Sequence, residues 1–275
     1  MGFPLSFEFF PPRTDKGREN LTEVILALKE LDPEYMSVTF GAGGSTQDGT
    51  FETVLDIKKQ GVQSAPHLSC IGAERESIAH LLGLYKDNEI NRIVALRGDL
   101  PSGAQDIGEF SYANELIEFI RSETGDHFHI EVAAYPEKHP QAKDFYQDFN
   151  NFKRKVEAGA NAAITQYFYN VDAYYNFMDE CVRHNIKIPI IPGIMPVTNY
   201  TQLLRFSTMC GAQIPRWLET RLEAFGDDID SIKKLGLDVV SKLCQDLLNI
   251  GAPGLHFYSM NKTEPCRQII QNLRS

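Results

Sequence analysis

The feature that most constrains this chain is a regular alternation of short apolar runs with segments of helical spacing. Each run is short and ends near a glycine, a proline or a polar turn, as buried strands do. The predicted strands are residues 5–10, 35–40, 64–70, 92–98, 129–135, 162–168, 188–194 and 255–260. Strands that alternate with helices predict a parallel sheet, because each parallel connection needs a long crossover.

The segments between the strands carry the apolar spacing of amphipathic helices. Leu21, Ile25 and Leu28 recur at intervals of three and four residues, and 78–85 and 239–248 show the same spacing. Helices of this kind bury one face and expose the other. They are therefore expected to cover the predicted sheet.

Chain length and strand number favour a single (β/α)8 barrel, the TIM-barrel fold, over residues 1–275. A barrel of this type needs about 250 residues, and eight strands are the number that closes it. An open doubly wound sheet is the alternative architecture. The region 199–250 is long, and we expect it to hold extra helices between the seventh and eighth strands.

Charge and cysteine content exclude several function classes. The net charge of −10 argues against nucleic acid or an anionic membrane as a partner, since both bind clustered lysine and arginine. Five cysteines without a CxxC pair argue against a disulfide framework, and no histidine or carboxylate group has metal-ligand spacing. With no signal-like start and no apolar run of membrane-spanning length, a cytoplasmic protein is expected.

Polar side chains recur in the later half of five predicted strands, where buried parallel strands are normally apolar. In the first strand Glu8 alternates with Phe7 and Phe9, so it should point into the barrel near its top. Comparable positions are held by Thr39, His67, Arg97 and Gln166. Active sites of parallel barrels lie at the carboxyl ends of the strands, so this convergence predicts one polar cavity there.

Glu8 is the strongest candidate for acid–base chemistry. Among Phe7, Phe9 and Phe10 its carboxyl group should be partly desolvated, which raises a carboxyl pKa and favours a general acid. The alternative is a structural glutamate paired with an arginine. For Asp99 the alternative is a turn cap, and for His67 a hydrogen-bonded structural histidine.

Eight segments, in order along nearly the whole chain, carry a resemblance to a known enzyme family. They are SFEFFPPR (6–13), SVTFGAGG (37–44), APHLSC (65–70), VALRGDLP (94–101), AAYPEKHPQA (133–142), NFKRKVEAGANAAITQYF (151–168), IIPGIMPV (190–197) and LHFYSMNKTE (255–264). Together they resemble the methylenetetrahydrofolate reductases, whose catalytic domain is a (β/α)8 barrel carrying FAD. The resemblance is to the short bacterial form, without the regulatory domain of eukaryotic members.

The resemblance implies a reaction in two halves. NADH or NADPH reduces FAD, and the flavin then passes hydride to 5,10-methylenetetrahydrofolate, giving 5-methyltetrahydrofolate for methionine synthesis. The two substrates use overlapping space in turn, which is a ping-pong scheme. The resemblance also implies a homo-oligomer, since short members commonly form homotetramers.

The resemblance also implies roles for individual residues. Glu8 matches the general acid that opens the imidazolidine ring, and Asp99 matches an aspartate near the flavin and the pterin. The implied FAD-binding residues are Thr39, Ala42, His67, Arg97, Gly98, Asp99, Ala113, Tyr135, His139, Ala142, Asp148, Asn151, Arg154 and Lys155. The implied substrate-binding residues are Glu8, Asp99, Gln166, Gln202, Phe206 and Lys262.

Two basic features are interpreted differently once the resemblance is considered. The KRK run at 153–155 would by itself be a solvated helix face, whereas the resemblance places Arg154 and Lys155 near the FAD diphosphate. Lys262 stands where bacterial relatives have arginine. A lysine keeps the charge but loses the fork that binds a carboxylate through two hydrogen bonds.

Two other functions remain open from the sequence. One is a barrel lyase or methyltransferase that binds a pterin without flavin, and the other is a barrel that binds a ligand without catalysis. A yellow protein that bleaches with NADH or NADPH in the absence of air would separate the reductase from both.

Overall fold

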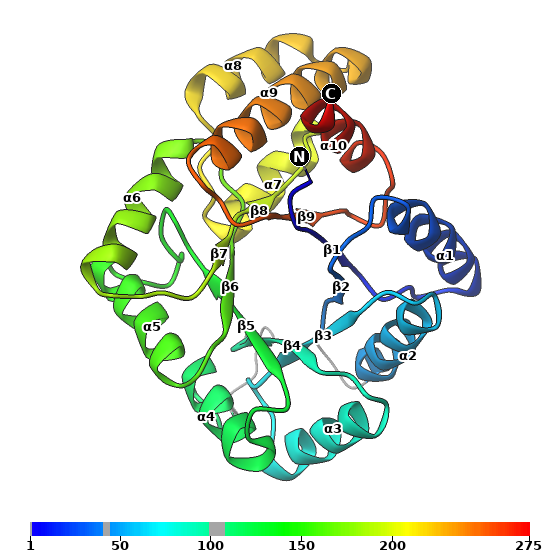
Figure 1. Cartoon of the computed structure of the whole chain (residues 1–275). Coiled ribbons are helices and arrows are strands. Elements are labelled where there is room, and N and C mark those ends of the chain that lie inside the picture. The colour runs from blue at the N-terminus through cyan, green and yellow to red at the C-terminus, as the bar shows by residue number, and fades with distance from the viewer. Residues whose placement is uncertain (1, 41–44, 99–107) are drawn as a thin grey trace.

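The computed structural model shows the strands arranged as one parallel barrel surrounded by helices (Figure 1), and it describes residues 2–40, 45–98 and 108–275. The strands are β1 (Leu5–Phe9), β2 (Tyr35–Val38), β3 (Ser64–Ser69), β4 (Arg92–Leu96), β5 (His129–Ala134), β6 (Ala162–Thr165), β7 (Ile190–Ile191), β8 (Gly193–Ile194) and β9 (Leu255–Tyr258). Their order is β7-β6-β5-β4-β3-β2-β1-β9-β8, and every pair is parallel.

Strands β7 and β8 together form the seventh predicted strand. Only Pro192 separates them, and proline has no N–H to donate to a strand ladder. One half pairs with β6 and the other with β9, so the sheet closes across this break. The predicted eight-position barrel is therefore confirmed, and the open doubly wound sheet is wrong.

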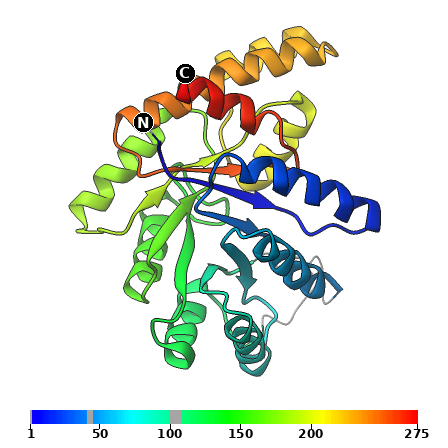
Figure 2. The same ribbon diagram turned by 45° about the vertical axis from the view of Figure 1, so that its right-hand side comes forward.

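The helices lie outside the barrel in both views (Figures 1 and 2). They are α1 (Asp15–Lys29), α2 (Ser45–Lys59), α3 (Arg75–Asp87), α4 (Ala113–Thr124), α5 (Phe145–Glu157), α6 (Val171–Arg183), α7 (Tyr200–Cys210), α8 (Arg216–Phe225), α9 (Ile229–Asn249) and α10 (Cys266–Arg274). Helices α7, α8 and α9 stand between β8 and β9, which confirms the extra helices predicted for 199–250. No helix in the described ranges is both long enough and apolar enough to cross a bilayer.

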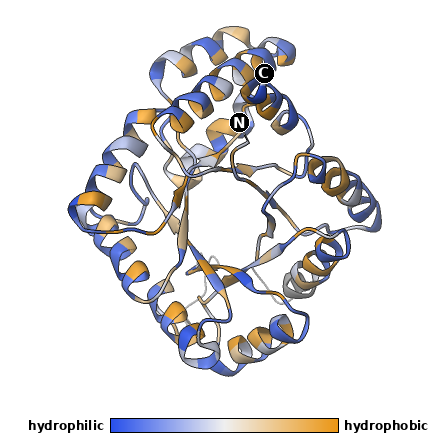
Figure 3. Cartoon of the chain, in the orientation of Figure 1, coloured by the Kyte–Doolittle hydropathy of each residue, from blue (hydrophilic) through white to orange (hydrophobic). Residues whose placement is uncertain are grey.

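The main core lies between the barrel wall and these helices. Helix α1 is an example of how the local sequence sets a helix start. The Thr14 side chain caps its first turn by accepting a hydrogen bond from the Gly17 backbone N–H. Its predicted apolar stripe, Leu21, Ile25 and Leu28, is buried. Helices carry hydrophilic residues beside these apolar ones (Figure 3), as expected for helices with one face in water. Truncating a side chain such as Leu28 to alanine should cost about 2–5 kcal/mol.

Several strands end earlier than the sequence pattern suggested. Thr39, Arg97 and Gln166 each follow the last strand residue instead of lying within the strand. These residues begin the loops at the carboxyl end of the barrel. Two of them already have polar partners there, since Arg97 donates to the Gln141 side chain and the Gln166 side-chain oxygen accepts from the Tyr167 backbone N–H.

Candidate active site

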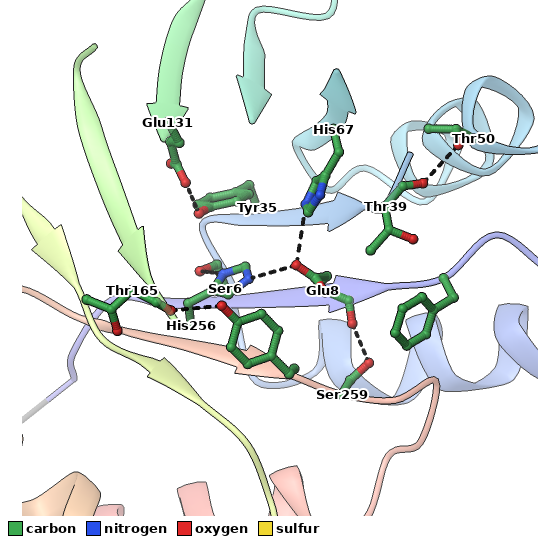
Figure 4. Close-up of polar contacts among 12 residues, drawn as sticks. Ser6, Glu8, Tyr35, Thr39, Thr50, His67, Glu131, Thr165, His256 and Ser259 are labelled. Carbon is green, nitrogen blue, oxygen red and sulfur yellow. Dashed lines mark hydrogen bonds and ion pairs between the residues drawn. The ribbon is translucent and has the colours of Figure 1, made fainter. Parts of the chain in front are cut away.

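Glu8 projects from β1 into the barrel, and two histidines face its carboxylate (Figure 4). Its side chain is 13% exposed. The Oε2 atom lies 3.4 Å from His67 Nε2 and 3.8 Å from His256 Nε2. Within the described residues, both Nε2 atoms are buried without a hydrogen-bond partner. The carboxylate therefore has two close imidazoles but no committed hydrogen bond to either.

The phenyl rings that flank Glu8 in sequence do not enclose its carboxyl group. Phe7 and Phe9 are fully buried in the outer core, on the opposite face of β1, and Phe10 is 42% exposed. Strand alternation separates them from Glu8, so the expected aromatic surroundings are wrong. The ion-pair partners of Glu8 in the described part of the chain are the histidines, and no arginine pairs with it there.

Burial favours the neutral forms of two groups near Glu8, His67 and Tyr258. Desolvation lowers the pKa of His67, against the raising effect of the Glu8 charge. Desolvation also raises the pKa of Tyr258 well above its usual range, with Glu8 adding to the effect. The Tyr258 hydroxyl donates to the Thr165 carbonyl at 2.8 Å.

A separate cavity opens at the carboxyl ends of β4 and β5, against α4 and α5. Its volume is about 480 Å³, within the range of small-molecule sites. Ten residues singled out from the sequence line it, namely Arg97, Gly98, Ala113, Tyr135, His139, Ala142, Asp148, Asn151, Arg154 and Lys155. Tertiary structure thus gathers residues from four separate segments into one wall.

Sequence reasoning missed other residues that line this cavity: Ala95, Leu96, Tyr112, Asn114, Ala133, Gln141 and Gln147. One of them had a usable signal. Gln147 lies four residues before Asn151 and seven before Arg154 on α5, so helical spacing places all three on one face. Tyr112 and Asn114 at the start of α4 had none, because only the barrel closure brings that helix end to the cavity.

The cavity combines cations with an apolar wall. The Lys155 ammonium donates to the Ala133 carbonyl, and its burial lowers the lysine pKa to about 8. Arg97 donates to the Gln141 side chain at 2.7 Å. Arg154 lines the cavity without an ion pair among the described residues. Such a donor set suits an anionic group attached to a flat apolar one.

Asp148 and Gly98 shape the same cavity. The Asp148 carboxylate accepts a hydrogen bond from the backbone N–H of His139 at 2.8 Å, and burial raises the pKa of Asp148. Gly98 has φ of +82°, and an added Cβ would lie 1.8 Å from Ser69 Oγ. Only glycine fits there, so the backbone itself forms this part of the wall.

The remaining sequence candidates lie apart from this cavity. Thr39 begins the loop after β2, where its carbonyl accepts from the Thr50 hydroxyl at 2.9 Å. Gln166 lines a small cavity beside α7. Gln202 and Phe206 are half-buried on α7, and Lys262 is exposed after β9. Ala42 and Asp99 lie outside the described residues.

His256, which lies 3.8 Å from the Glu8 carboxylate, is a neighbour of Glu8 that sequence reasoning overlooked. Its strand was predicted, and alternation with Phe257 places the imidazole on the interior face. The register pairs His256 with Ser6, and Ser6 Oγ lies 2.7 Å from His256 Nδ1. The signal was therefore present in the alternation, but nothing in the sequence linked positions 6 and 256.

The same chain matches a known family over nearly its full length. The family model described as methylenetetrahydrofolate reductase matches residues 2–274. The chain belongs to the methylenetetrahydrofolate reductase family.

Members of the methylenetetrahydrofolate reductase family from bacteria and plants are similar to it. The 5,10-methylenetetrahydrofolate reductase of Pectobacterium carotovorum is 42% identical over 94% of this chain and 86% of that protein. The Salmonella typhimurium enzyme of the same name is 41% identical, covering 98% of this chain and 90% of that protein. The Arabidopsis thaliana methylenetetrahydrofolate reductase (NADH) 1 is 38% identical over 98% of this chain but only 48% of its own length.

A solved structure supports the barrel fold of this member of the methylenetetrahydrofolate reductase family. An uncharacterized protein from Clostridium thermocellum, described as binding two copies of 5-methyl-5,6,7,8-tetrahydrofolic acid, superimposes with a TM-score of 0.68. It covers 99% of this chain and 92% of its own at 18% identity. At that identity the likeness shows the fold alone.

Proposed function

We propose that this protein is an FAD-dependent reductase that converts 5,10-methylenetetrahydrofolate to 5-methyltetrahydrofolate with electrons from NADH or NADPH. Family membership and the names of the relatives support the folate reaction. The observation that carries the proposal is a recessed Glu8 carboxylate at the same barrel end as the cation-lined cavity. One supplies a proton and the other holds a cofactor.

The residues of the cavity fit FAD. Arg154 and Lys155 would hold the diphosphate, and Gly98 would let the backbone approach the cofactor closely. Ala95, Leu96 and Ala133 offer an apolar wall for the rings. Bound FAD supplies hydride transfer, accepting from the nicotinamide and giving to the folate in turn, which is the basis of a ping-pong scheme.

Glu8 supplies the acid for the folate half-reaction. Its carboxyl O–H bond breaks, and the proton forms an N–H bond with one nitrogen of the imidazolidine ring. The ring C–N bond then breaks and its electron pair stays on that nitrogen, which leaves a carbon able to accept hydride. Glu8 remains as a carboxylate between two imidazoles. The nicotinamide half-reaction needs no such acid.

Further contacts complete the proposed substrate site. Gln166 and Asp99 would hold the pterin, and Gln202 and Phe206 on α7 would contact folate or nicotinamide. Lys262 would meet the glutamate tail with a single charge. A cytoplasmic homo-oligomer that supplies methyl groups for methionine synthesis completes the proposal.

Flavin spectroscopy tests this function directly. Purified protein, reconstituted with FAD, should be yellow and should bleach when NADH or NADPH is added without air. Addition of 5,10-methylenetetrahydrofolate should restore the colour and yield 5-methyltetrahydrofolate. A protein that cannot be reconstituted with FAD, or whose flavin is not reoxidised by the folate, would contradict the proposal.

A further inference from the structure

Polar side chains from β1, β2, β5 and β9 lie near one another in the barrel interior, between Glu8 and Glu131 (Figure 4). His256 Nε2 faces the Glu8 carboxylate at 3.8 Å, and His256 Nδ1 lies 2.7 Å from the Ser6 hydroxyl. Ser6 and Tyr35 are register partners on β1 and β2, and both line the same cavity. The phenol donates to Glu131 on the far side of the barrel interior. Each neighbour in this series can both give and accept a proton.

The series ends at a second cavity, on the amino-terminal side of the barrel. This cavity has a volume of about 190 Å³. Its polar lining consists of Ser6, Glu34, Tyr35, Arg92, His129 and Glu131. Glu131 is fully buried, whereas the side chain of His129 is 39% exposed and lies 3.9 Å from the Glu131 carboxylate. This end therefore connects a buried carboxyl group with the solvent.

Charged and titratable groups from the neighbouring elements hold Glu131 in place. Arg92 on β4 pairs with its Oε1 atom, and the guanidinium also lies 4.2 Å from the centre of the Tyr35 ring. His129 precedes it by two positions on β5, and Tyr35 reaches it from β2. On β6 its register partner is Ala162, which carries no charge. Both oxygens are thus oriented, one toward Arg92 and one toward the polar series.

We propose that the barrel interior conducts a proton from the amino-terminal cavity to Glu8. The path consists of Glu131, Tyr35, Ser6 and His256, in that order. This inference rests on the proposed role of Glu8 as the acid of the folate half-reaction, because an acid spent in each turnover must regain its proton. Glu8 is already recessed, and a substrate seated against it closes its upper approach.

The transfer conserves protons at every step. Glu131, protonated from water at the amino-terminal cavity, gives its proton to the Tyr35 oxygen while Tyr35 passes its own to Ser6. Ser6 passes its proton to His256 Nδ1, and the Nε2–H of His256 goes to the Glu8 carboxylate. Each of the three intermediate groups loses one proton and gains one, so only Glu131 and Glu8 change charge.

A Tyr35→Phe variant removes one link and leaves the ring in place. Tyr174→Phe is the matched control, because it also removes the hydroxyl of a buried tyrosine. Tyr174 lies outside the barrel, where its hydroxyl donates to the Ile190 carbonyl. With FAD bound, a single folate turnover should proceed at the wild-type rate in both variants. Repeated turnover at low buffer concentration should slow about tenfold or more in Tyr35→Phe alone. A small diffusible acid such as imidazolium should restore it.

Solvent exchange of the His256 ring proton provides a readout that needs neither flavin nor folate. In nitrogen-15-labelled protein, NMR exchange spectroscopy should show slower exchange of this N–H with water in Tyr35→Phe than in Tyr174→Phe. Ser6→Ala, which cuts the path one step nearer Glu8, should show the same slowing and serves if Tyr35→Phe fails to fold.

The outcomes separate this inference from the proposed function. Unchanged repeated turnover and unchanged exchange in the cut variants would overturn the proton path. A single turnover slowed as much as repeated turnover would also overturn it, since the residues would then only hold the site in shape. A wild-type protein without folate reduction would refute the proposed function, while the exchange measurement would still decide whether the path conducts.

Discussion

The two ends of the barrel each hold a recessed carboxylate, and the two are satisfied very differently. Glu131, at the amino-terminal end, is fully buried and bonded to both Arg92 and Tyr35. Glu8, at the carboxyl-terminal end, is 13% exposed and has two imidazoles nearby without a hydrogen bond to its carboxylate. A carboxylate whose oxygens both have hydrogen-bond or ion-pair partners is fixed in position. One that is partly exposed and has no hydrogen bond to its carboxylate can exchange a proton directly with a substrate.

The comparison extends to the surroundings of each group. The amino-terminal cavity is small and its main charges, Arg92 and Glu131, cancel each other. The carboxyl-terminal cavity is larger and carries Arg154 without an ion pair among the residues described. The amino-terminal end therefore contributes mainly to stability, and the carboxyl-terminal end has the larger capacity to bind a ligand. Parallel barrels in general show this difference between their two ends.

The sharpest test of this comparison is Glu8→Gln, with the largest expected effect. Folate reduction should fall by about 10²–10⁴-fold, because the amide cannot donate the proton as an acid does. Flavin reduction by the nicotinamide should remain nearly intact, and stability should change little. Stopped-flow measurement of each half-reaction checks this, and equal loss in both would indicate a structural glutamate.

Glu131→Gln should lose stability, which Glu8→Gln should not, and it should also slow repeated folate turnover because Glu131 is the entry of the proposed proton path. Removing the carboxylate leaves Arg92 poorly compensated in a buried site, at a cost of about 3 kcal/mol in unfolding free energy. Flavin affinity should be close to wild type, because Glu131 does not line that cavity. Urea denaturation measures the unfolding free energy of Glu131→Gln and Glu8→Gln side by side, so that each variant serves as the control for the other. Equal stability of the two variants would remove the distinction between the ends.

Arg154→Ala should weaken FAD retention by about 1 kcal/mol, or roughly fivefold, since an exposed arginine loses part of its attraction to solvent screening. Lys153→Ala is the matched control on the same helix, because Lys153 pairs with Glu157 and does not line the cavity. Fluorescence titration with FAD measures both affinities. The same affinity in the two variants would count against a diphosphate at this end of the cavity.

The smallest expected effect concerns His129, whose pKa is lowered to about 4 by burial and by the charges of Arg92 and Arg121. Between pH 6.5 and about 4 the unfolded chain binds a proton there that the folded chain does not, so stability falls as pH falls through this window. His129→Gln should reduce that loss by at most about 1 kcal/mol, because the ring is partly exposed. Urea denaturation midpoints of both proteins at pH 7 and pH 5 measure this loss of stability. The same change in midpoint between the two pH values in both proteins would contradict the prediction.

Much of the fold was predictable because the pattern is local. Alternation along β1 correctly placed Glu8 inside and Phe7 outside, and the apolar stripe of α1 is buried as expected. The same alternation predicted one shared polar cavity, which is wrong in detail: Glu8 and His67 lie together, Gln166 lines a different cavity, and only Arg97 lines the larger one. What failed was the inference from sequence neighbours to spatial neighbours, since the phenylalanines beside Glu8 contact the helices instead.

The sequence by itself therefore determined the element types, the barrel and the face on which each polar residue lies. These follow from periodicity, which acts between residues a few positions apart. Only the tertiary structure decided that His256 meets Ser6 and Glu8, and that Tyr35 meets Glu131. Those contacts depend on strand register and on closure of the ring at Pro192, and register is set by packing of the whole sheet.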